Sequence, residues 1–61
     1  MSARILVVDD IEANRRVLKA KLEVQYYTVL QAANGPRALE IAKSEQPDII
    51  LLDVIIGRAH V

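Results

Sequence analysis

Three short runs of aliphatic residues divide the chain and predict β-strands. The first covers residues 4–8 and stops at Asp9 and Asp10, the second covers 27–32, and the third covers 49–56. The third run contains seven apolar residues among eight, interrupted by Asp53 alone. Short, β-branched apolar runs of this kind are typical of strands buried on both faces of a sheet.

Between the first two runs, the apolar residues recur at helical spacing. Ile11, Leu18 and Leu22 share one stripe, and the opposite face carries the charged residues Glu12, Arg15, Arg16, Lys19 and Glu23. This pattern predicts an amphipathic helix of about four turns. Asp10 stands immediately before it, in a position suited to cap its first turn.

The segment Asn34-Gly35-Pro36 predicts the start of a second helix. Proline suits the first helical position, and Gly35 or Asn34 can serve as the cap. Ala38, Leu39, Ile41 and Ala42 supply its apolar face, and it should end before Pro47.

The resulting order is β-α-β-α-β with short connections, which predicts an α/β fold for residues 1–61. Right-handed crossovers place the first strand in the middle of a parallel sheet, in the order 2-1-3. The two helices then lie on opposite faces, as in a doubly wound, flavodoxin-like sheet. Ligands of such sheets bind beyond the carboxyl ends of the strands.

Composition and charge exclude several classes of function. The chain has 61 residues and no cysteine, so disulfides and thiolate metal sites are absent. Eight basic and eight acidic residues cancel, which gives no footprint for nucleic acid. No apolar run approaches the length of a membrane span, and no secretory signal is visible. We expect a cytoplasmic location and no membrane partner.

Asp9, Asp10 and Asp53 should meet at one edge of the predicted sheet, since each follows or ends a strand. Carboxylates this close repel one another unless a cation neutralises them, and Mg²⁺ prefers such oxygen ligands. A carboxylate beside the metal can also act as a nucleophile toward a phosphoryl group. The alternative is structural, because an aspartate after a strand is often only a helix cap. The residues alone leave both interpretations open.

Two motifs add a resemblance to a known family. The chain carries Ile5-Leu6-Val7-Val8-Asp9-Asp10 before a helix and Pro47-Asp48-Ile49-Ile50-Leu51-Leu52-Asp53-Val54 about forty residues later. Over residues 3 to about 56 it resembles the CheY-like receiver domains of two-component response regulators. It is most similar to receivers attached to diguanylate cyclases, which carry stretches like Asp10-Ile11-Glu12-Ala13-Asn14 and Tyr26-Tyr27.

The resemblance implies a role for each acidic residue. Asp53 would be the phospho-acceptor and also a metal ligand. Asp10 would bind Mg²⁺ directly, and Asp9 would bind it directly or through water. The backbone carbonyl of Ile55 would complete the protein ligands. A histidine kinase would be the partner if signalling is retained, and the chain itself would not be an enzyme. A nucleotide-binding enzyme is a distant alternative, because no Gly-rich phosphate loop follows the first strand.

The chain also departs from the family. A full receiver has about twice this length and five strands, and its second half supplies a serine or threonine and a lysine to the site. Lys19, Lys21 and Lys43 lie in predicted helices and do not match that lysine. After Asp53 the family commonly continues with two apolar residues and Pro-Gly, whereas this chain has Val54-Ile55-Ile56-Gly57.

These departures predict a half-domain that is completed by a second copy. The third strand would be an exposed apolar edge, which favours pairing with another strand. We therefore expect a homodimer with the third strands antiparallel about a two-fold axis, or an exchange of elements between copies. The predicted interface residues are Ile50, Leu52, Val54, Ile55 and Ile56. A deliberately engineered half-domain with a residual acidic site is the resulting hypothesis, and a phosphoryl-accepting signalling module is the alternative.

Overall fold

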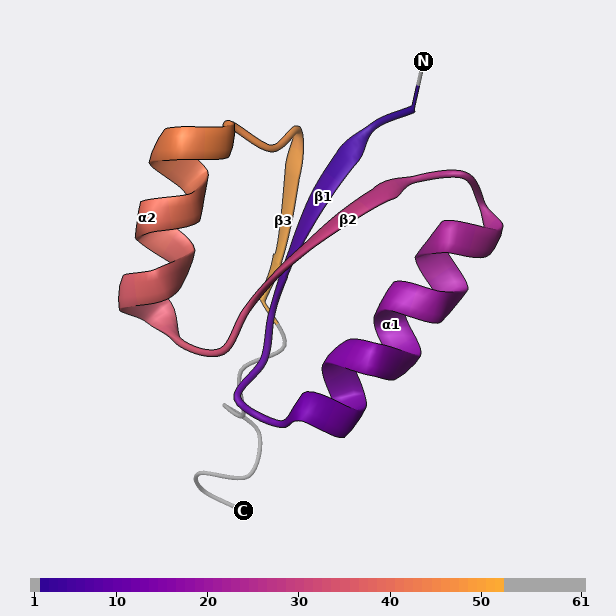
Figure 1. Ribbon diagram of the computed structural model, residues 1–61, viewed down its shortest axis with the longest axis horizontal. Helices are drawn as coiled ribbons and strands as arrows, with labels where there is room; N and C mark the ends of the chain where they lie inside the picture. Colours follow the sequence, from indigo (N-terminus) through magenta and orange to yellow (C-terminus); the bar gives the residue numbers. More distant parts are fainter. Residues whose placement is uncertain (1, 53–61) are drawn as a thin grey trace.

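A computed structural model describes residues 2–52, which form three strands and two helices (Figure 1). In chain order they are β1 (Arg4–Val8), α1 (Glu12–Val24), β2 (Thr28–Ala32), α2 (Gly35–Glu45) and β3 (Ile49–Leu52). The element order agrees with the sequence pattern, and the boundaries shift by one or two residues. The predicted continuation of the third strand to residue 56 lies outside the described residues.

The strands form one parallel sheet in the order β2-β1-β3, which confirms the predicted topology. Ile5 pairs with Val29 on one side and with Ile49 on the other, and Val8 pairs with Ala32 and Leu52. Figure 1 shows α1 and α2 on opposite sides of the strands. The three strands therefore end level with one another at the carboxyl edge of the sheet.

The core is built on β1, the middle strand. Leu6 and Val7 have no exposed surface, and Ile5 and Val8 are 3% exposed. Leu6 and Val8 pack with Ala32 of β2 and Ala38 of α2. Because side chains alternate along a strand, Ile5 and Val7 point to the other face, toward α1. A strand that is apolar at every position after Arg4 is thus buried on both faces.

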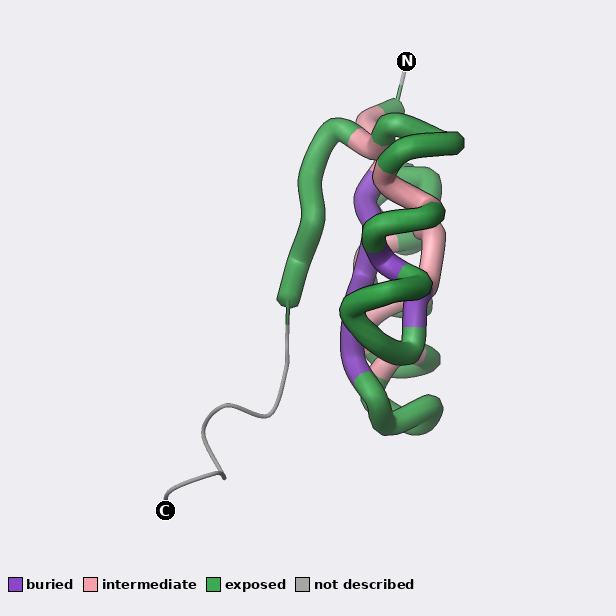
Figure 2. The backbone as a smooth tube through the Cα atoms, turned by 90° about the vertical axis from the view of Figure 1, so that its left-hand side faces the viewer, coloured by how far each residue is buried: buried purple, intermediate pink, exposed green. Residues whose placement is uncertain are grey.

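The flanking elements are much more exposed than β1. Leu18 and Leu22 of the predicted apolar stripe on α1 are half-buried, whereas Ile11 and Val17 are exposed, and none of the helix's thirteen residues is fully buried. All four residues of β3 are exposed, as Figure 2 shows by the contrast between this strand and the buried β1. Among residues 2–52, the outer edge of β3 has no strand beside it.

Polar contacts fasten β3 to β1 at the amino-terminal end of the sheet. The backbone N–H of Arg4 donates to Asp48 Oδ2, and the backbone N–H of Asp48 donates to the Arg4 carbonyl, both at 2.8 Å. The Arg4 guanidinium also donates to Glu45 Oε1 at 2.8 Å, and both of these side chains are partly exposed. These bonds hold the end of α2 and the start of β3 against the first strand.

The helix starts are stabilised in different ways. Of the two caps that the sequence offered for α2, Gly35 and Asn34, the structure has Asn34, whose Oδ1 accepts from the Arg37 backbone N–H at 2.8 Å. The predicted cap at Asp10 is wrong, because the cap position of α1 is Ile11, which makes no side-chain capping bond. Instead, Oδ1 of Asp9 accepts from the Ile11 backbone N–H at 2.9 Å. The carboxylate that stabilises this turn is one residue earlier than the pattern indicated.

The end of α1 is a helix-terminating turn that normally favours glycine. The Tyr26 N–H donates to the Glu23 carbonyl at 2.9 Å, and the Tyr27 N–H donates to the Leu22 carbonyl at 3.2 Å. This is the bond pattern of a Schellman motif, whose turning residue adopts the left-handed conformation. Tyr26 takes it with φ 68°, although its Cβ makes this region costly.

Replacing Tyr26 by glycine should therefore stabilise the chain. The tyrosine side chain is 85% exposed, so little packing is lost, while the left-handed backbone is relieved. Part of this relief is offset by the extra conformational freedom of glycine in the unfolded state. We therefore expect a net gain of about 0.5–1 kcal/mol in the free energy of unfolding, measured by urea titration.

The matched control is Tyr27→Gly at the next position. Tyr27 is only 37% exposed and its φ is negative, so this change removes contacts without relieving strain. We expect it to lower stability. A Tyr26→Gly chain that unfolds at a lower urea concentration than the unchanged chain would contradict the interpretation of this turn.

Candidate functional site

Two aspartates occupy the turn between β1 and α1, at the carboxyl edge of the sheet. Asp9 directly follows Val8, the last residue of β1, and Asp10 comes next. Val8 is paired with Leu52, the last described residue of β3, and Asp53 directly follows Leu52 in the sequence. The structure thus brings Asp9 and Asp10 to the predicted edge, whereas Asp53, Val54, Ile55 and Ile56 lie outside the described residues.

Asp9 is buried, with 2% of its surface exposed, and the surrounding backbone holds it in place. Its N–H donates to the Ala32 carbonyl of β2 at 3.1 Å. Its Oδ1 accepts the Ile11 N–H, and its carbonyl oxygen accepts Nη1 of Arg15 at 2.7 Å. The main chain and the side chain of Asp9 are therefore both fixed.

Asp10 lies in a different environment, because it is exposed to solvent. Two neighbouring carboxylates thus have contrasting surroundings: one is buried and hydrogen-bonded to the turn, and the other is hydrated. A hydrated carboxylate beside a fixed one suits Mg²⁺, which binds few protein oxygens and keeps several of its waters. The chemistry of these donors therefore fits the ion that the sequence predicted.

The described residues do not by themselves form a group that could hold a metal ion. Among residues 2–52, no third histidine, cysteine, aspartate or glutamate joins Asp9 and Asp10 in a group that could hold a metal. The third predicted carboxylate is Asp53, beyond this range.

Comparison with known proteins decides the family. A model of the response regulator receiver domain matches residues 5–60, which is most of the 61-residue chain. The chain belongs to the response regulator receiver family. Receiver domains generally bind Mg²⁺ at their acidic phosphorylation site, and the residues of this chain that would hold the ion stay a prediction.

Individual relatives agree with the family match. The receiver is 64% identical over 56 residues to response regulator PleD of Caulobacter vibrioides. It is 48% identical over 58 residues to response regulator MprA of Mycobacterium ulcerans. It is also 45% identical over 58 residues to the alkaline phosphatase synthesis transcriptional regulatory protein PhoP of Bacillus subtilis.

These alignments cover 92–95% of this chain but only 12–25% of the relatives. What the relatives do as whole proteins therefore does not transfer directly to this receiver.

Neither helix within residues 2–52 has the length and apolar character of a membrane span.

Arg15 is the residue of this site that the sequence pattern missed. The pattern assigned it to the charged, outward face of the first helix, yet it is half-buried and bonded to Asp9. A signal was present in the sequence. Arg15 is the fourth residue of α1, and a cation in the first turn opposes the helix dipole unless another contact compensates it.

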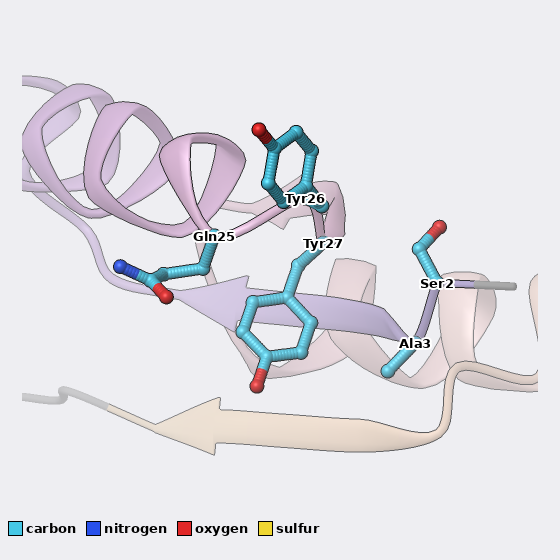
Figure 3. Close-up of a pocket in the computed structure, with 5 residues that line it drawn as sticks. All are labelled: Ser2, Ala3, Gln25, Tyr26 and Tyr27. Carbon is cyan, nitrogen blue, oxygen red and sulfur yellow. The ribbon is translucent and has the colours of Figure 1, made fainter.

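A shallow pocket of about 640 Å³ lies away from the acidic turn, where the end of α1 meets the start of the chain (Figure 3). It is lined by Ser2, Ala3, Gln25, Tyr26 and Tyr27. None of these residues carries a carboxylate, so the pocket adds no ligand to the site at the carboxyl edge.

The geometry predicts that Mg²⁺ stabilises the folded receiver through Asp10. If the dissociation constant is taken as about 1 mM, about 10 mM Mg²⁺ should raise the free energy of unfolding by about 1.4 kcal/mol, because an ion bound only to the folded chain stabilises it. Asp10→Asn should remove most of this gain, as measured by urea titration with and without MgCl₂.

The control is Asp48→Asn, which neutralises a carboxylate at the opposite end of the sheet and keeps an oxygen to accept from Arg4. It should retain the full response to Mg²⁺. Equal responses in the two variants would mean that Mg²⁺ acts elsewhere.

Proposed function

We propose that this receiver accepts a phosphoryl group on Asp53, in the presence of Mg²⁺ held by Asp9 and Asp10. The observation that carries the proposal is the register of β1 and β3. Val8 pairs with Leu52, so the residues that follow these partners in the sequence are Asp9 and Asp53. The family match supports the same assignment.

The chemistry is the transfer of a phosphoryl group from a donor to the Asp53 carboxylate. A carboxylate oxygen of Asp53 attacks the phosphorus of the donor, an O–P bond forms, and the bond from phosphorus to the donor's leaving group breaks. A histidine kinase carrying a phosphohistidine is the expected donor, and its imidazole is then the leaving group. Bound Mg²⁺ supplies charge screening between the carboxylates and the phosphoryl oxygens. Asp9 and Asp10 would hold the ion, and the Ile55 carbonyl would be the further ligand expected from the family.

The lysines of the described chain do not replace the family's missing lysine. Nζ of Lys19 lies 3.1 Å from Oε2 of Glu23, its neighbour along α1. Lys21 and Lys43 are exposed near the final turns of their helices.

A small phosphodonor tests the assignment. Incubation with acetyl phosphate and Mg²⁺ should add the mass of one phosphoryl group to the unchanged chain, and Asp53→Asn should abolish the addition. Asp48→Asn is the matched control, because it removes the carboxylate that stands just before β3 rather than just after Leu52. It should be modified like the unchanged chain, and peptide mapping by mass spectrometry locates the added group.

The site of addition is the decisive readout. Phosphorylation mapped to Asp53 in the unchanged chain and retained in Asp48→Asn supports the proposal. An unchanged chain that shows no added mass, or one modified at another carboxylate, contradicts it.

We propose a second property for the same strand, namely that β3 pairs with β3 of a second copy when the 61-residue chain is alone. The supporting observation is exposure on both faces of the strand: 44% for Ile49, 47% for Ile50, 37% for Leu51 and 66% for Leu52. Exposed apolar edge strands favour the addition of another strand. An antiparallel pair about a two-fold axis satisfies both copies at once.

An apolar groove of about 510 Å³ beside β3 adds to this surface. It is lined by Gly35, Pro36, Ala38, Leu39, Ala42, Ile50 and Leu52, none of which is charged. Ile50 and Leu52 thus remain interface residues of the proposal, together with the expected Val54, Ile55 and Ile56.

The engineered origin suggested by the sequence finds no support in the comparisons. The cytoplasmic location stays a prediction.

Molar mass in solution tests the pairing. Sedimentation equilibrium should give the mass of a dimer for the unchanged chain, and Ile50→Lys should give a monomer because it places a charge in the apolar contact. Val17→Lys is the matched control, since Val17 is comparably exposed, at 53%, but lies on α1. It should remain dimeric. An unchanged chain that is monomeric at every concentration contradicts the pairing.

A further inference from the structure

The side chain of Arg15 contacts the backbone of the acidic turn. Its Nη1 donates to the carbonyl oxygen of Asp9 at 2.7 Å. Arg16, the next residue, behaves differently: its side chain is 74% exposed and pairs with Glu12 at 3.2 Å on the helix surface. Two adjacent arginines of α1 thus have different partners, and only Arg15 contacts the turn.

The bonded oxygen belongs to the peptide unit that joins Asp9 to Asp10. A peptide unit is planar, so fixing its oxygen restricts the rotation on either side of it. The donor is a charged guanidinium, which makes the hydrogen bond stronger than one between neutral groups. Asp9 is already held by its N–H and its carboxylate. The additional bond from Arg15 therefore limits how Asp10 is oriented relative to Asp9.

We propose that Arg15 is a positioning residue for the acidic site. By holding the peptide between the two aspartates, it keeps their carboxylates in one relative arrangement before Mg²⁺ arrives. The role in Mg²⁺ binding rests on the proposed function above. The hold on the turn is a property of the chain without the ion and can be measured separately.

Charge and position act in opposite directions here. A guanidinium near a cation site repels Mg²⁺, so removing it tightens Mg²⁺ binding if charge alone matters. If Arg15 positions the turn, its removal weakens binding, because the free chain then samples other arrangements. The direction of the change in Mg²⁺ affinity therefore distinguishes the two effects.

The experiment compares Arg15→Ala, Arg15→Lys and the control Arg16→Ala in the 61-residue chain. Calorimetric titration gives the Mg²⁺ dissociation constant, and amide hydrogen exchange without Mg²⁺ reports on the Ile11 N–H that donates to Asp9. We expect Arg15→Ala to weaken Mg²⁺ binding about tenfold, the low end for a residue supporting a metal ligand. It should also speed exchange at Ile11.

The lysine variant keeps the charge but has no planar fork, so we expect a smaller loss of affinity than with alanine. Arg16→Ala should change neither readout. Faster exchange at Ile11 in Arg15→Ala than in the unchanged chain, together with the graded loss of affinity, supports the positioning role.

Several results would overturn it. Unaltered or tighter Mg²⁺ binding in Arg15→Ala, unaltered exchange at Ile11, or an equal loss in Arg16→Ala each contradicts the role of Arg15. Absence of Mg²⁺ binding in the unchanged chain contradicts the proposed function instead, and with it any effect of Arg15 on the ion.

Discussion

Burial of residues 5–8 of β1, the middle strand, is the constraint on which the rest of the structure depends. Leu6 and Val7 have no exposed surface, and fully burying a side chain of this kind contributes about 1.5–3 kcal/mol. β2, β3 and both helices are arranged around this strand, while their own outer surfaces remain partly exposed. The position of the acidic turn is set by β1, because Asp9 is the first residue after the buried run.

Much of this fold could be predicted from the sequence, because its main features depend on local patterns. The β-branched run at 5–8, the Asn34-Gly35-Pro36 start and the short connections are each specific, and right-handed crossovers then give the strand order. The position of Asp9 and Asp10 at the carboxyl edge follows from the same order. The roles predicted for Asp53, as phospho-acceptor, and for the Ile55 carbonyl, as metal ligand, stay predictions.

The details that the sequence pattern missed depend on local backbone geometry and side-chain reach rather than on spacing. The pattern placed the cap of α1 at Asp10, but the chain turns so that Asp9 meets the Ile11 N–H. The pattern also placed Arg15 on the outer face of the helix. It missed the contact with Asp9 because a long flexible side chain can extend toward a backbone oxygen that lies off its own face. The left-handed backbone of Tyr26 was equally hidden, since nothing in the residue type favours that conformation.

The contrast between the two aspartates has a consequence for which substitutions the turn can tolerate. Position 9 is closed to solvent and accepts a backbone N–H, so its side chain must be short and must offer an oxygen acceptor. Position 10 is exposed, so the size of its side chain is little restricted, and its charge matters through the proposed binding of Mg²⁺. Two neighbouring aspartates should therefore tolerate different substitutions in a saturation library. Position 9 should accept only short side chains with an oxygen acceptor, whereas position 10 should accept side chains of various sizes that keep the negative charge.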